Sequence, residues 1–173
     1  MSWAQPVRLG ELSRGPVRLT LAPDEAELAW IARDLGLIGL PAFTAQVEVA
    51  PWLDGAVLKG RLRAVVIQTC GVSLEPFEQP LEAEFEVRVL PAGSPNLPQD
   101  AGGELTLDLD APDPPDELEG DAIDVGGYVV EHLALSLDPF PRKPGVEFGY
   151  VDEKADTASP FAVLKGLKDR KDG

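Results

Sequence analysis

The chain has 173 residues, the size of one domain or of one domain with tails. Hydrophobic residues make up 44% and charged residues 26%, which excludes a wholly disordered chain and allows a sizeable core. Thirty acidic and 15 basic residues give a formal net charge of −15, which argues against coating of nucleic acid or of an anionic membrane by bulk electrostatics.

A strand and a helix are predicted first, from two different spacings of apolar residues. Val17, Leu19 and Leu21 alternate with polar residues, as in a strand. Pro23 is predicted to open a helix that Gly36 ends. One face of this helix is predicted to be buried, because apolar residues recur at i, i+3, i+4 and i+7: Leu28, Ile31, Ala32 and Leu35.

A block of strands follows. Alternating apolar residues predict strands over 43–49, 58–66, 81–89 and 105–109, and an Asp54-Gly55 turn separates the first two. Because the alternate positions are polar, we expect an antiparallel sheet with one face in water.

The second helix is predicted to begin at Asp121, with Asp121 and Asp124 resembling a capping box, and to end at Pro139. A short strand over 146–150 and a terminal helix from Ser159-Pro160 complete the prediction. The fold class is therefore α+β, with an antiparallel sheet or partly open barrel, two main helices and a short C-terminal helix.

Proline- and glycine-rich stretches set the expected domain organisation. We expect a single domain over residues 1–151 with mobile loops near 91–103 and 111–120. Residues 152–173 are expected to form a polar linker and a short basic C-terminal helix. Its cations either dock back on the core or engage an acidic partner such as RNA.

Basic residues at 59, 61 and 63 could track phosphates or could pair with glutamates at 82, 84 and 86. We favour pairing, in a register that places Arg63 beside Glu84 and Arg61 beside Glu86. In this register Lys59 meets Arg88.

Nine acidic and no basic residues lie between residues 104 and 124. A calcium loop of the EF-hand type fails because Pro112 occupies a ligand place. We favour a solvated acidic linker that can attract a basic protein, and keep a carboxylate-dependent metalloenzyme as the weakest hypothesis.

The single Cys70 excludes an internal disulfide and a paired-cysteine metal knuckle. We expect Cys70 to be a buried, inert thiol and the single His132 to lie at a helix edge. Residues 1–6 lack the pattern of a signal peptide, and no run of about 18 apolar residues is present. The expectation is a cytoplasmic protein with no cofactor, metal, membrane or DNA partner.

Three blocks together resemble the YceD family of large ribosomal RNA subunit accumulation proteins, in the form found in alphaproteobacteria. The first runs from Val66 to Cys70 and continues through Leu74-Glu75-Pro76 to Glu84-Phe85; the second spans 121–139, and the third spans 159–164. The positions that carry the resemblance are Gln68, Cys70, Leu74, Glu75, Pro76, Ile123, Asp124, Pro139, Pro160 and Phe161. Many relatives have a second cysteine where this chain has Ser73, so no metal role is carried over.

The resemblance implies a bacterial, non-enzymatic factor for 23S rRNA accumulation and large-subunit assembly. We expect it to act through contacts with a ribosomal protein or a pre-ribosomal particle. RNA contact would be limited to small basic patches, with candidate residues Arg142, Lys143, Lys165 and Lys168. The alternative is an acidic chaperone or adaptor for a basic ribosomal protein.

Overall fold

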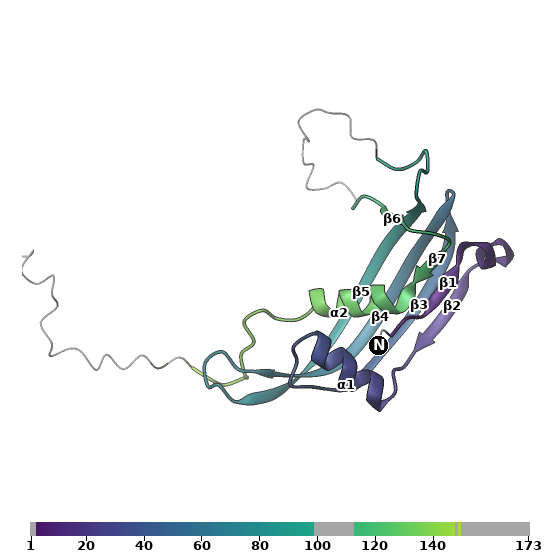
Figure 1. The fold of residues 1–173 in the computed structure, drawn as a ribbon. Coiled ribbons are helices and arrows are strands. Elements are labelled where there is room, and N and C mark those ends of the chain that lie inside the picture. Colours follow the sequence, from purple (N-terminus) through teal and green to yellow (C-terminus); the bar gives the residue numbers. More distant parts are fainter. Residues whose placement is uncertain (1–2, 99–112, 148, 150–173) are drawn as a thin grey trace, which may run out of the picture. The chain divides into compact units, whose positions relative to one another are not determined.

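The computed structural model describes residues 3–98, 113–147 and 149. Figure 1 shows the helices and strands of these residues, all of which lie before Ser136. In chain order they are β1 (Pro6–Arg8), the 3₁₀ helix η1 (Leu9–Arg14), β2 (Val17–Leu21), α1 (Glu25–Asp34), β3 (Gly39–Trp52), β4 (Gly55–Thr69), β5 (Pro76–Pro91), β6 (Asp116–Leu118), β7 (Ala122–Asp124) and α2 (Val125–Leu135).

The main sheet is open and has the strand order β2-β3-β4-β5-β6. Its first four strands pair antiparallel, whereas β6 pairs parallel with the end of β5. A separate two-stranded sheet joins β1 to β7. The predicted α+β class with an antiparallel sheet is confirmed. The sheet does not close into a barrel, and the parallel edge strand and the small second sheet were not predicted.

The alternation of side chains gives the main sheet one apolar and one polar face. Val49, Leu58 and Val87 are register partners on neighbouring strands and share the apolar face. Both α1 and α2 lie on this side of the sheet (Figure 1), where their apolar residues join one core cluster. The three predicted long strands are therefore confirmed, together with the assignment of their faces.

Helix α1 begins at Glu25, two residues later than the predicted start at Pro23. Asp24 is the N-cap: its side chain accepts a hydrogen bond from the Glu27 amide, and the Glu27 side chain accepts one from the Asp24 amide. The predicted apolar stripe is confirmed, because Ile31 and Ala32 are buried and their neighbours on the stripe pack against the core.

The predicted start of the second helix at Asp121 is wrong. Asp124 caps α2, because its Oδ1 atom accepts hydrogen bonds from the Gly127 amide at 3.1 Å and from the Gln5 amide at 3.0 Å. Residues Ala122–Asp124 are instead extended, since they pair with β1 at the distant N-terminal end. The helix ends at Leu135 with Ser136 as its C-cap, before Pro139.

Two other expectations meet the structure only in part, and two more fall on residues that the structure does not describe. The acidic loop expected near 111–120 contains β6, and Leu118 in this strand is buried. Val146, Glu147 and Gly149 lie in no strand, while residues 148 and 150 of that predicted strand fall outside the described residues. The predicted strand over 105–109 and the predicted terminal helix also fall outside them. No helix in the described part of the chain has the length and apolarity of a membrane span.

Gly60 at the middle of β4 permits a close aromatic contact. A Cβ atom there would lie 2.3 Å from the ring of Phe85, its cross-strand partner. The Phe85 ring also stacks on the half-buried His132 of α2, with 4.4 Å between ring centroids and 8° between planes. The glycine thus lets the ring lie between the sheet and the helix.

We predict that Asp124→Ala lowers the free energy of unfolding by about 1–3 kcal/mol, because two backbone amides lose their acceptor. Asp121→Ala is the matched control, and we expect a change within about 0.5 kcal/mol for this exposed side chain. Urea unfolding of both variants measures the difference. Equal losses in the two variants would contradict the assignment of the cap.

Candidate functional site

Two segments that are far apart in the sequence meet at one end of the β4–β5 hairpin. The loop Cys70–Glu75 joins these strands, and the segment Asp138–Lys143 follows α2. The Gly71 amide donates to the Pro141 carbonyl at 2.9 Å, and the Lys143 ammonium lies 2.9 Å from the Glu75 carboxylate. We call Gln68, Cys70–Glu75 and Asp138–Lys143 the Cys70 cluster.

Cys70 is the centre of this cluster. Its side chain is buried, and its Sγ atom accepts hydrogen bonds from the amides of Val72, Ser73 and Lys143, each at 3.4 Å. The Ser73 hydroxyl, followed by the Ser73 and Lys143 amides, lowers the pKa of the Cys70 thiol to about 6. The sulfur is therefore largely a thiolate at neutral pH, held in place by the segment that follows α2.

Burial of Cys70 is confirmed, but its acidity was not predicted. The sequence offered His132 as the one histidine base, and the structure places that ring against Phe85 instead. The hydrogen bonds to the sulfur come from the cluster's own loop and from Lys143. A catalytic thiol must be accessible to its substrate and needs a base that accepts its proton. Buried Cys70 instead suits a structural role, in which its sulfur holds two segments together.

Two apolar side chains project from the cluster into solvent. Leu74 has a left-handed backbone with a φ of 59°, and the residue is 75% exposed. Phe140 is 79% exposed and lies between two prolines. A left-handed leucine is costly and an exposed aromatic ring gains nothing from folding, so both features indicate a contact surface. Phe140 was not predicted as a site residue, although its flanking prolines bar an aromatic residue from a helix or a central strand.

The other resemblance positions have mostly structural roles. Gln68 donates to the Asp138 carbonyl at 3.4 Å, and its Oε1 atom is buried without a hydrogen-bond partner among the described residues. Pro76 begins β5, Ile123 is buried in β7, and Pro139 is exposed. Positions 160, 161, 165 and 168 lie outside the described residues.

The two candidate RNA contacts of the cluster differ. Arg142 is exposed to solvent, whereas Lys143 is half-buried and paired with Glu75. Lys143 therefore has an internal partner for its charge, and the role of both residues toward RNA stays a prediction.

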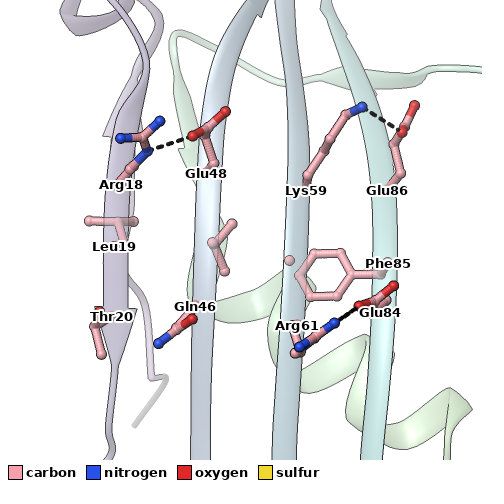
Figure 2. Close-up of a pocket in the computed structure, with 12 residues that line it drawn as sticks. Arg18, Leu19, Thr20, Gln46, Glu48, Lys59, Arg61, Glu84, Phe85 and Glu86 are labelled. Carbon is pink, nitrogen blue, oxygen red and sulfur yellow. Dashed lines mark hydrogen bonds and ion pairs between the residues drawn. The ribbon is translucent and has the colours of Figure 1, made fainter.

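The polar face of the sheet carries a ladder of opposite charges, but the predicted register is wrong by two residues. Arg61 lies opposite Glu84, Arg63 opposite Glu82 and Lys59 opposite Glu86. Figure 2 shows the Arg61–Glu84 and Lys59–Glu86 pairs, together with Arg18–Glu48 on the strands beside them. A slip of two residues keeps every side chain on its face, so the alternation could not distinguish the registers.

These ion pairs line a shallow hollow of about 750 Å³ above Gly60 (Figure 2). Each cation in it has a carboxylate partner: Arg18 with Glu48 at 2.6 Å, Lys59 with Glu86 at 3.1 Å and Arg61 with Glu84. Pairing neutralises the positive stripe, as expected, and makes it a poor track for phosphates.

The acidic excess lies around β6, β7 and α2. Eight acidic and no basic residues occur from Asp113 to Pro141. Tyr128 of α2 donates to the Asp116 carboxylate of β6 at 3.0 Å, and burial and this carboxylate raise the pKa of the phenol. Among the described residues no group of three or more His, Cys, Asp or Glu side chains could hold a metal ion. Asp108 and Asp110 lie outside them.

Comparison with known proteins places most of the chain in a protein family. A family model described as large ribosomal RNA subunit accumulation protein YceD matches residues 58–168. This span contains the Cys70 cluster, most of β4 with all of β5, and the acidic elements from β6 to α2. No curated protein and no solved structure matches the chain.

We predict a thiolate titration with a midpoint near pH 6, followed by the ultraviolet absorbance of the thiolate, with Cys70→Ala as the blank. Because the folded pKa lies below the ordinary value of 9.0, the contribution to stability is complete above about pH 9 and is lost as the pH falls through 6. Urea unfolding over this range should show that slope only in the wild-type chain. A midpoint near 9 would contradict the arrangement of amides around the sulfur.

Proposed function

The chain belongs to the YceD family, and we propose that it supports accumulation of large-subunit ribosomal RNA by recognition, without catalysing a reaction. The family match over residues 58–168 is the observation that carries this proposal. The RNA concerned is the 23S species, and the setting is assembly of the large subunit in the bacterial cytoplasm.

The surface features of the described residues support recognition of a protein. Leu74 and Phe140 expose apolar area on the two segments that the Cys70 thiolate ties together. An apolar pair on a fixed support is typical of a contact that gains affinity by burying those side chains. We therefore propose that the Cys70 cluster contacts a ribosomal protein or a pre-ribosomal particle, with RNA contact limited to Arg142 and the basic tail.

A second candidate function is an acidic adaptor for a basic ribosomal protein. The run of eight acidic residues without a basic one from Asp113 to Pro141 favours it. Such a surface speeds association with a cationic partner and disfavours approach of bare RNA. The two candidates share a partner class and differ in the surface that binds it.

We predict that a strain lacking this chain has a lower ratio of 23S to 16S rRNA, and that the wild-type chain restores it. The double variant Leu74→Asn/Phe140→Ser should restore the ratio only in part, because the apolar contact is lost while exposed positions leave the fold intact. Leu53→Asn/Ile38→Ser is the matched control, since Leu53 is also left-handed and both residues are exposed elsewhere.

An unchanged ratio in the deletion strain would refute the proposed function. Equal loss in the test and control variants would refute the role of the Cys70 cluster.

We predict for the adaptor that Asp113→Asn/Glu117→Gln/Glu119→Gln lowers recovery of basic ribosomal proteins in a pull-down from cell extract. The reason is the lost attraction between opposite charges. Glu25→Gln/Asp34→Asn/Glu48→Gln removes the same charge from other exposed or half-exposed positions. Equal recovery of basic ribosomal proteins with the two variants would contradict the adaptor function.

A further inference from the structure

Within the described residues, no strand pairs with most of the outer edge of β5. β4 pairs with β5 from Pro76 to Val89, whereas β6 pairs with β5 only from Val89 to Pro91. Figure 1 shows β6 as a short arrow beside the end of that long strand. Within the described residues, therefore, no strand lies against the outer edge of β5 between Pro76 and Arg88.

An open edge of this length is a template for another extended segment, because alternate N–H and C=O groups point outward from it. Pro76 and Pro80 are consistent with an edge strand. An inner strand uses its N–H groups on both of its sides, and proline has none to donate. The remaining residues of this stretch supply donors and acceptors for an added strand.

Charge on the polar face alternates from strand to strand. One row runs from Arg18 on β2 through Glu48 on β3 and Lys59 on β4 to Glu86 on β5. Two further rows pair β4 and β5, as Arg61–Glu84 and Arg63–Glu82. In all three rows the last charge, at the open edge, is a carboxylate. A strand that continues the alternation carries a cation at every second position.

The space beside this edge is also acidic. A groove of about 570 Å³ lies between the Glu86–Arg88 stretch of β5, the approach to β6, and α2. Four carboxylates line this groove: those of Glu86, Asp113, Asp116 and Glu131. Arg88 is the one cation in its lining, and Tyr128 and His132 also line it. A basic segment that follows the edge toward β6 would meet favourable charge along its path.

We propose that the outer edge of β5 binds an extended basic segment of a partner protein by strand addition. Lysine or arginine side chains at alternate positions of that segment lie against Glu82, Glu84 and Glu86. The inference rests on the proposed function and names its partner class, a protein with a cationic extended segment. Residues 99–112 of this chain are a poor occupant, since they contain four acidic and no basic residues.

The first test uses a peptide of about nine residues that alternates lysine and valine, added to the full-length chain labelled for NMR. We expect shifts and slowed hydrogen exchange at β5 amides between Phe77 and Val87. Two further peptides distinguish strand addition from charge attraction. In one of them the backbone amides of the odd-numbered residues are N-methylated, and in the other those of the even-numbered residues. Only one of them should lose binding, because only one set of amides faces β5. Equal binding of both would overturn the proposal.

The second test removes the carboxylates at the edge. Glu82→Gln/Glu84→Gln/Glu86→Gln should weaken binding of the unmethylated peptide about ten-fold. Glu25→Gln/Glu48→Gln/Glu119→Gln carries the same change of net charge, breaks one ion pair of the ladder and leaves the edge intact. An equal loss in this control would show binding by overall charge and overturn the proposal.

Other occupants give different results. If neutralising Lys165, Lys168, Arg170 and Lys171 is required before the peptide binds, the chain's own tail occupies the edge and the proposal fails. If a single-stranded RNA shifts the same β5 amides, the partner class is wrong. These outcomes are independent of the rRNA ratio in the deletion strain, which decides the proposed function whatever the peptide does.

Discussion

The pairing of β4 on both sides is the constraint on which the rest of the structure depends. Its residues face β3 from Gly55 to Ile67 and β5 from Ala56 to Thr69, so two long neighbours are held in fixed register. Because side chains alternate, this register decides both faces at once: Leu58 and Leu62 enter the core, and Lys59 and Arg61 meet carboxylates. The core, the ladder of opposite charges and the carboxylates of Glu82, Glu84 and Glu86 at the outer edge of β5 are consequences of one arrangement of backbone hydrogen bonds.

The Cys70 cluster depends on the same pairing. The hairpin turns between Thr69 and Pro76, and its loop folds so that backbone amides converge on the sulfur. The third amide comes from Lys143, beyond α2, so an anion fixes the exit of the helix relative to the sheet. A proton on that sulfur weakens all three contacts together, which couples the loop to the helix exit by electrostatics rather than by buried area.

Long periodic elements were predictable from the sequence, and short or distant contacts were not. The alternation in β3, β4 and β5 and the helical spacing of α1 are local properties, so their faces could be assigned before the structure. β6 and β7 have three residues each and form because a distant strand accepts them. Likewise, nothing in the local sequence distinguishes Asp121 from Asp124 as the cap of α2. The hydrogen bond from the distant Gln5 amide to the Asp124 side chain favours Asp124. The contact of Cys70 with Lys143 spans 73 positions and leaves no periodic trace.

The stack of Phe85 on His132 gives the molecule a built-in reporter. The chain has one imidazole, and its ring lies flat on a benzene ring at a centroid separation of 4.4 Å. The ring current of Phe85 shields the two carbon-bound protons of the His132 imidazole, so their NMR signals shift upfield while α2 packs on the sheet. Lifting of the helix returns them to ordinary frequencies, which makes docking visible in a proton spectrum of unlabelled material.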